Sequence, residues 1–333
     1  MLKTQLYVGC LLVSLCVMLV ACNLQRSRQT PAYKPLKILL ISDLNDAYGS
    51  LDYSGEVQDL VRQLPQIQPD MILCAGDMVA GQKASLSRGR LDSMWNGFYK
   101  YVLEPTSVQG IPFAFTMGNH DASPNFHKDR AAAQDFWLAH AEDTHLDFVD
   151  KTHYPFWFSY RQGDMFFISW DASASRVPQE VMTWMQQQLQ TQEARQAHMR
   201  IVLGHLPLYA LVEAKNTAGE VNANADAALD FFKTNGVDLY ISGHQHAYFP
   251  GRKAGVNLLN LGCLGGGPRP LIGDDRPGIK TYSILEFNVD KSLKISTVDA
   301  VTKAQIPLEV LPDTVQGFNG TLWRMDLRPP KPL

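Results

Sequence analysis

The stretch Ile111-Pro112-Phe113-Ala114-Phe115-Thr116-Met117-Gly118-Asn119-His120-Asp121 contains the pattern on which the fold assignment rests. An apolar run of strand length ends abruptly at Gly118, and three polar side chains follow that can bind a metal or move a proton. A glycine at this point lets the backbone turn tightly and approach an ion or a phosphate closely. The segment therefore predicts a buried strand with a polar site at its carboxyl end.

The same arrangement occurs four more times along the chain. Leu36 to Ile41 precedes Ser42-Asp43, Met71 to Ala75 precedes Gly76-Asp77, Ile201 to Leu203 precedes Gly204-His205, and Leu239 to Ser242 precedes Gly243-His244-Gln245-His246. Continuous apolar runs of this length are typical of strands buried on both faces.

Helical patterns lie between several of these strands. The apolar positions that share a helix face are Val57, Leu60, Val61 and Leu64, then Val181, Trp184, Met185 and Leu189, and then Ala225, Ala228, Leu229 and Phe232, with Gly236 as a helix stop. Alternating strands and helices predict an α/β fold with largely parallel strands. Because the carboxyl ends of parallel strands meet at one edge of a sheet, we expect the polar groups to converge there.

The later part of the chain adds further strands. Phe156 to Trp170 alternates around a Gln-Gly-Asp turn and predicts a β-hairpin, while Lys280 to Phe287 and Leu293 to Val298 predict two more strands. Ala122 to Tyr154 is a long polar and aromatic connection with weak helical character, which could form a lid or a cap insertion.

The amino terminus differs in composition from the rest. Lys3 is the only charged residue before Arg26, and the apolar run from Leu6 to Ala21 is shorter than the roughly 20 residues that a membrane-spanning helix needs. Such a segment is typical of an export signal. Leu19-Val20-Ala21-Cys22 resembles a bacterial lipobox, in which Cys22 carries the lipid. An uncleaved anchor helix with a chance cysteine is the alternative.

These features predict an exported, membrane-anchored lipoprotein of the cell envelope, on its periplasmic face. Residues 1–21 form the signal peptide that is removed, residues 22–35 a polar tether, residues 36–310 the folded domain, and residues 311–333 a C-terminal tail that wraps the surface or is loose. Asn23 after the cysteine favours an outer membrane over an inner one.

Composition sets two further expectations. The formal net charge is −3, and the sequence has no basic stripe. We therefore expect no surface that binds nucleic acid. Cys74 and Cys263 lie in apolar, strand-like runs, which favours buried free thiols, although two cysteines in an oxidising compartment could also pair.

The residues expected at the sheet edge are two aspartates, an asparagine and several histidines. Carboxylates, an amide oxygen and imidazoles together suit hard or borderline divalent metals, and no cysteine takes part, which argues against a structural zinc site.

In their order, the five motifs resemble those of the calcineurin-like metallophosphoesterases. They are Asp43-Leu44-Asn45, Gly76-Asp77, Gly118-Asn119-His120-Asp121, Gly204-His205 and Gly243-His244-Gln245-His246, and the resemblance covers residues 36–300. A single Gly-Asp or Gly-His is common, but five such pieces in order, each at a strand end, are specific. The resemblance implies a four-layer αββα sandwich, in which two mixed β-sheets are flanked by helices.

The resemblance also implies a binuclear centre of two divalent ions, with manganese, iron or zinc left open. Asp77 would bridge the ions, Asp43 and His246 would bind the first, and Asn119, His205 and His244 would bind the second. A bridging hydroxide would attack phosphorus, and His120 would protonate the leaving oxygen. Asp121 would orient the His120 ring.

One position departs from the family pattern, because Asn45 stands where the family usually has histidine. Asn45 could bind the metal through its amide oxygen, Asp46 or Tyr48 could take its place, or the position could stay weak or empty. The exchange leaves the charge of the site unchanged and shifts its preference toward manganese or iron.

The implied function is hydrolysis of a phosphate ester outside the cytoplasm. The sequence does not separate a phosphatase from a phosphodiesterase, and the resemblance favours the diesterase. A membrane-tethered module that binds metal or phosphate without catalysis is the first alternative, and a structural envelope lipoprotein that keeps only the fold is the second.

Overall fold

The strands around the polar motifs form two β-sheets in the computed structural model, which describes residues 36–288 and 290–327. The five-stranded sheet has the spatial order β12 (Leu293–Asp299), β11 (Thr281–Phe287), β1 (Lys37–Ile41), β2 (Met71–Cys74) and β3 (Phe113–Phe115). β1, β2 and β3 are parallel, and β11 is antiparallel to β1. This sheet confirms the two late strands predicted from the sequence.

The second sheet has nine strands. Their spatial order is β13 (Thr314–Gly317), β14 (Gly320–Arg324), β9 (Phe249–Lys253), β10 (Val256–Asn260), β8 (Leu239–Ser242), β7 (Met199–Leu203), β6 (Met165–Ser169), β5 (Trp157–Gln162) and β4 (Asp147–His153). β6, β7, β8 and β10 run parallel, whereas β5 and β6 form the predicted hairpin.

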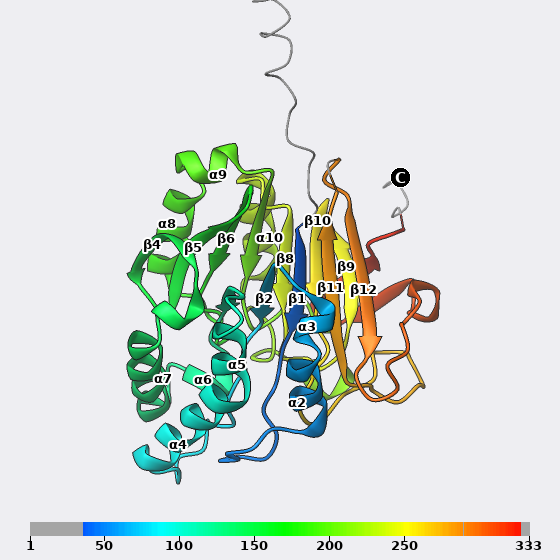
Figure 1. Cartoon of the computed structure of the whole chain (residues 1–333). Coiled ribbons are helices and arrows are strands. Elements are labelled where there is room, and N and C mark those ends of the chain that lie inside the picture. The colour runs from blue at the N-terminus through cyan, green and yellow to red at the C-terminus, as the bar shows by residue number, and fades with distance from the viewer. Residues whose placement is uncertain (1–35, 289, 328–333) are drawn as a thin grey trace, which may run out of the picture. The chain divides into compact units, whose positions relative to one another are not determined.

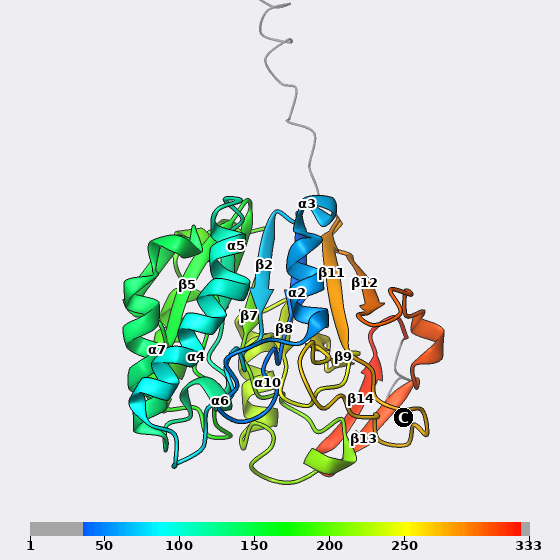
Figure 2. The same cartoon turned by 60° about the horizontal axis from the view of Figure 1, so that its bottom comes forward.

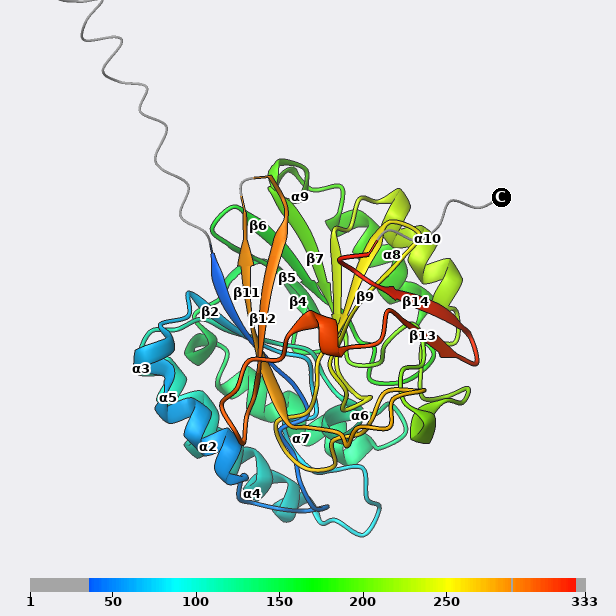
Figure 3. The same cartoon turned by 90° about the vertical axis from the view of Figure 1, so that its right-hand side faces the viewer.

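Helices cover the outer faces of both sheets (Figures 1 and 3). On the side of the five-stranded sheet lie α2 (Gly55–Arg62), α3 (Leu64–Ile67), α4 (Arg88–Phe98), α5 (Glu104–Ser107), the short α6 (Asn119–Ala122) and α7 (His127–Ala139). On the other side lie α8 (Gln179–Gln188), α9 (Gln192–Gln196) and α10 (Ala225–Thr234). The arrangement confirms the expected four-layer sandwich.

The side chains of the central strands alternate between two hydrophobic clusters, one on each face of the nine-stranded sheet. Phe166 and Val202 belong to the hydrophobic cluster beneath α8 and α10, whereas Phe167, Ile201 and Leu203 belong to the cluster shared with the five-stranded sheet. Since successive residues of a strand point to opposite faces, the apolar residues of these strands are buried on one side or the other. This explains why the sequence shows continuous apolar runs there.

The connection from Ala122 to Tyr154 forms part of the core, and the structure does not support a lid. It contains α7, which packs against α4, and the edge strand β4. The fully buried Trp137 of α7 stacks on Phe115 of β3, with 3.6 Å between the ring centroids. The aromatic residues of this segment therefore attach it to the five-stranded sheet.

The C-terminal segment, expected to wrap the surface or to be loose, is paired with the folded domain over residues 314–324. Its hairpin of β13 and β14 extends the nine-stranded sheet next to β9, and it buries Val315 and Leu322 (Figure 3). The sheet therefore continues beyond the expected domain boundary at residue 310, because the apolar hairpin face covers the end of the second hydrophobic cluster.

Other expectations concern cysteines and membrane segments. Cys74 and Cys263 are both buried and free, as predicted. Among the described residues, no helix has the length and apolar character needed to cross a membrane. The expected signal peptide, the Cys22 lipidation site and the tether lie outside the described residues.

The stacking of Trp137 on Phe115 allows a test of the α7 attachment. Trp137→Ala should lower the free energy of unfolding by roughly 3–5 kcal/mol, because it leaves a large cavity. Trp137→Phe should cost less than about 1.5 kcal/mol, since it keeps a ring and removes a buried indole N–H that has no partner. Urea denaturation measures both values, and equal losses would contradict this role of the ring.

Candidate metal centre

The five polar motifs meet at the carboxyl ends of the parallel strands of both sheets. Asp43, Asp77 and Asn119 follow β1, β2 and β3 of the five-stranded sheet, and His205 and His244 follow β7 and β8 of the other. Figure 2 shows the loops at these strand ends gathered on one side of the molecule. The convergence predicted from the sequence is confirmed.

Two groups of side chains could each hold a metal ion, and they share one carboxylate. One group is Asp77, His205 and His244, and the other is Asp43, Asp77 and His246. Within each group, the potential ligand atoms all lie within 4.8 Å of one another. The carboxylate of Asp77 therefore stands between two candidate metal positions.

The three histidines present defined ring nitrogens to the site, because the other nitrogen of each ring has a partner outside it. His205 Nδ1 lies 2.7 Å from the Ala75 carbonyl, and His246 Nδ1 lies 3.0 Å from the Gly267 carbonyl. His244 Nε2 lies 2.7 Å from Glu220 Oε2, so its Nδ1 faces the centre. Such partners set the tautomer and the orientation of metal-binding imidazoles.

Asn119 is oriented in the same way. Its Nδ2 donates to Gln82 Oε1 at 2.7 Å, and its Oδ1 lies 2.9 Å from His205 Nε2 and 2.8 Å from His244 Nδ1. The amide oxygen therefore points at the first group of side chains. Asn119 and this group form a four-residue set of one carboxylate, one amide oxygen and two imidazoles.

The backbone at the site is locally strained. Asp43, Asp77, His244 and His246 all have left-handed φ values between 51° and 68°, which non-glycine residues seldom adopt. Such conformations cluster at functional sites, where the surrounding structure maintains them. Gly118 is required for a steric reason, because a Cβ at this position would collide with the Asp77 carboxylate.

Burial makes the charges of the site costly unless cations compensate them. Asp43 and Asp77 are 0% and 1% exposed. Burial raises the pKa of the Asp77 carboxyl, but His205 and His120 outweigh that effect and hold its pKa well below the usual value. Burial lowers the pKa of the His205 ring, yet Asp77 raises it to about 9. The two carboxylates therefore require positive charge next to them.

His120 lies at the mouth of the site. Its backbone N–H donates to Asp77 Oδ1 at 2.8 Å, its Nδ1 lies 3.3 Å from the Gly81 carbonyl, and its Nε2 lies 3.9 Å from Asp77 Oδ2. The ring is partly exposed, so Nε2 can reach a bound substrate. This position fits a side chain that faces substrate and binds no metal.

Asp121 does not orient the His120 ring, contrary to the expectation. Its Oδ1 accepts from the Val79 N–H at 2.9 Å, and its Oδ2 accepts from the Gly118 N–H at 2.8 Å. Asp121 is fully buried and connects the loop after β2 to the loop after β3. The Gly81 carbonyl is instead the group beside His120 Nδ1.

The three candidates for the remaining metal ligand occupy different environments. Asn45 is buried and donates Nδ2 to the Val79 carbonyl at 3.2 Å. Asp46 is exposed, and the exposed ring of Tyr48 lies beside the His120 ring. Asn45 is the only one of the three candidates that is buried.

Three further residues contact the candidate ligands and have no sequence motif. Glu220 and Lys215 contact His244 Nε2 at 2.7 and 3.1 Å, and Gln82 holds Asn119. Burial of His244 and its Coulombic interaction with Lys215 contribute to lowering the pKa of that ring, and the hydrogen bond from His244 helps to lower the pKa of Glu220 to about 2. All three lie in loops without a motif, so no sequence signal marks them.

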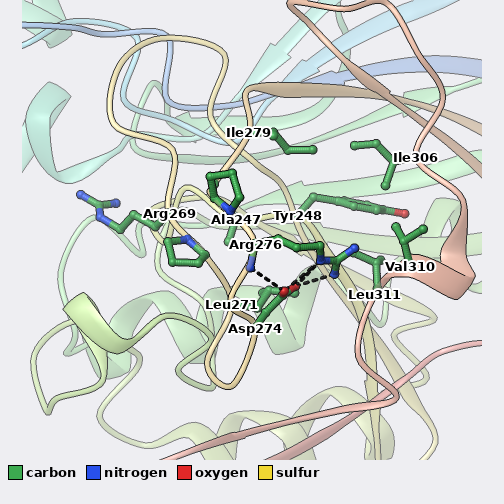
Figure 4. Close-up of a pocket in the computed structure, with 13 residues that line it drawn as sticks. Ala247, Tyr248, Arg269, Leu271, Asp274, Arg276, Ile279, Ile306, Val310 and Leu311 are labelled. Atoms are coloured by element: carbon green, nitrogen blue, oxygen red, sulfur yellow. Dashed lines mark hydrogen bonds and ion pairs between the residues drawn. The ribbon is translucent and has the colours of Figure 1, made fainter.

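A mostly apolar cavity of about 300 Å³ lies beside the loop that holds His246 (Figure 4). Tyr248, Leu271 and Ile279 contribute to its lining, and an ion pair between Asp274 and Arg276 lies within it. The loop connects the cavity to the centre, because the Arg269 N–H donates to the His246 carbonyl at 3.1 Å.

Comparison with known families agrees with this geometry. Residues 36–248, more than half of the chain, match the family model of the calcineurin-like phosphoesterases. The chain belongs to this family. Calcineurin-like phosphoesterases are hydrolases that typically bind divalent metals, and the Asp and His groups described above could hold such ions in this member.

Solved structures show the same fold at low sequence identity. Purple acid phosphatase PPD1 from yellow lupin (Lupinus luteus) aligns with a TM-score of 0.59 and 16% identity over 82% of this chain, which spans 53% of the lupin chain. GAP50 from Plasmodium, described as the anchor in its inner membrane complex, aligns with a TM-score of 0.53 and 15% identity, covering 83% of this chain and 88% of that chain. No curated protein matches this phosphoesterase in sequence.

The contact between Glu220 and His244 leads to a prediction about metal affinity. Glu220→Ala should weaken metal binding by roughly 10–100-fold, because His244 loses the partner that fixes its ring. Isothermal titration of the metal-free protein with manganese measures the change. Glu213→Ala, at an exposed glutamate in the same loop, is the matched control and should bind as the wild type does. Equal affinities of the two variants would exclude this role of Glu220.

Proposed function

We propose that this phosphoesterase hydrolyses phosphate esters, phosphodiesters or phosphomonoesters, at a centre of two divalent metal ions. The observation that carries the proposal is the position of Asp77, which belongs to both candidate ligand groups. Asp43 and His246 complete the first metal position, and Asn119, His205 and His244 complete the second. A pair of divalent ions held there would lower the pKa of a bound water and would stabilise the charge that develops on the phosphate.

The donor atoms suit such ions. The centre offers carboxylates, an amide oxygen and imidazoles, which bind manganese, iron and zinc. Its buried carboxylates require positive charge, and the second ring nitrogen of each histidine is already bonded elsewhere. A site built only for protein stability would have no need of three such oriented rings.

The protein's own groups perform two tasks in the reaction. The ligand side chains would hold the ions that attract the phosphate, so that the new P–O bond forms in line with the P–O bond that breaks. His120 then transfers the proton on Nε2 to the leaving oxygen, while its Nδ1–H donates to the Gly81 carbonyl. Water supplies the oxygen added to phosphorus, and one of its protons finally restores His120.

We further propose that the enzyme acts outside the cytoplasm, as a lipoprotein anchored through Cys22. The support for this location is the sequence of residues 1–22, with its short apolar run and lipobox-like end. Phosphate esters outside the cytoplasm would then be its substrates.

A non-catalytic binding module is the second candidate. GAP50, which shares the fold, is described as an anchor. The position of His120 beside Asp77 favours the hydrolase, because a module that only binds metal or phosphate has no use for a proton donor at that place.

Turnover of simple esters tests the function. The full chain, purified in detergent and loaded with manganese, should hydrolyse p-nitrophenyl phosphate or bis-p-nitrophenyl phosphate, and a chelator should abolish the activity. The ratio of the two rates shows which ester class is preferred. His120→Ala should lower kcat by roughly 10²–10⁴-fold with metal content unchanged. Metal binding without turnover would instead support the binding module.

Single substitutions can identify the remaining ligand of the first metal position. Asn45→Ala should weaken the binding of one of two manganese equivalents by at least roughly tenfold, whereas Asp46→Ala should leave both unchanged. Titration calorimetry measures stoichiometry and affinity together. A loss with Asp46→Ala and none with Asn45→Ala would assign the ligand to Asp46.

A further inference from the structure

We propose that Tyr48 is the surface on which the leaving group of the ester rests, and that this enzyme prefers leaving alcohols that carry an aromatic or other planar ring. The inference rests on the proposed function, because it uses His120 as the proton donor. It adds a specificity-determining residue that lies outside the five motifs.

The position of the leaving group follows from the proton transfer. The leaving oxygen must lie within hydrogen-bond reach of His120 Nε2. The ring of Tyr48 lies next to that histidine, with 5.3 Å between the ring centroids and 49° between the ring planes. A group attached to a leaving oxygen at His120 therefore comes within reach of the Tyr48 ring.

Tyr48 is available for such a contact. Its side chain is 56% exposed, the most exposed aromatic side chain among the described residues, whereas most aromatic rings of the domain are buried. The exposed ring is free to contact a group bound at His120, because no other part of the described chain covers it. Substrate binding would bury this ring and the group that rests on it.

The loop that carries Tyr48 is held in place. The Gly49 N–H donates to the Ala80 carbonyl at 2.8 Å, and Arg90 Nε donates to the Gly49 carbonyl at 2.7 Å. Ser50 closes a turn on Ala47 at 2.9 Å. The ring is thus presented by a bonded loop, which lowers the entropy lost when a ligand binds.

The chemistry of a tyrosine ring favours a planar partner. Aromatic pairs gain free energy beyond the burial of apolar area, whereas a small alkyl group offers little area and no π face. Lys83 Nζ lies 5.9 Å from the centre of the Tyr48 ring, so a cation already occupies one approach to its π system. An aryl ester and a nucleoside 5′-phosphate ester share the required planar ring but place it at different distances from phosphorus.

The experiment compares leaving groups across variants of the full chain in detergent, loaded with manganese. The substrates are the phenyl, nucleoside 5′- and methyl phosphate esters of whichever class, monoester or diester, the wild type hydrolyses. The variants are Tyr48→Ala and Tyr48→Phe, with Leu138→Ala as the matched control at an exposed apolar side chain of α7. The readouts are kcat and KM for each substrate.

We expect Tyr48→Ala to lower kcat/KM for at least one ring-bearing ester by roughly 2–10-fold relative to its effect on the methyl ester, mainly through KM. Tyr48→Phe should keep the wild-type preference, because it retains the ring, and Leu138→Ala should change nothing. A selective loss with the phenyl ester identifies an aryl leaving group, and one with the nucleoside ester identifies a nucleoside.

Two results would overturn the assignment while leaving the proposed function intact. Equal losses for all three esters would show that Tyr48 positions His120, and no loss for any of them would show that the leaving group does not touch it. If the wild type hydrolysed none of the esters, the proposed function and this assignment would fall together.

Discussion

The buried carboxylates of Asp43 and Asp77 are the constraint on which the site depends. Two negative charges at adjacent strand ends, both removed from water, are stable only beside compensating cations. Three histidines from the opposite sheet supply ligands at that place, and their outer nitrogens are bonded to Ala75, Glu220 and Gly267. Divalent metal ions would supply the positive charge that the carboxylates require, and the oriented rings could bind them.

The packing of the two sheets determines where the ligands of the site lie. Parallel strands in both sheets direct their carboxyl ends toward one side, and packing the sheets together brings Asp43 of one sheet next to His244 of the other. The contact is direct, because the backbone N–H of His244 donates to Asp43 Oδ2 at 3.0 Å. Asp121 then connects the loops after β2 and β3. The hydrophobic core between the sheets therefore determines how close the ligands lie.

Most of the fold was predictable because its signals are local. Apolar runs that end in a small residue and a ligand predicted β1, β2, β3, β7 and β8, and the helical faces of α2, α8 and α10 were equally clear. The structures of the connection after Ala122 and of the C-terminal segment were not predictable. Their aromatic and apolar residues pack against partners that are distant in the sequence. Trp137 packs on Phe115, and Leu322 packs into the second cluster.

The sequence by itself determined which residue types stand at the strand ends, and hence the family and the candidate ligands. Each ligand follows its strand within a few residues, so chain connectivity alone places it at the sheet edge. Only the tertiary structure decided what surrounds those ligands. Glu220, Lys215 and Gln82 come from loops without a motif, and Asp121 bonds to backbone amides instead of the His120 ring. The neighbours of Tyr48 likewise depend on how two separate loops pack, and contacts of that kind are set by the three-dimensional fold and have no signature in sequence spacing.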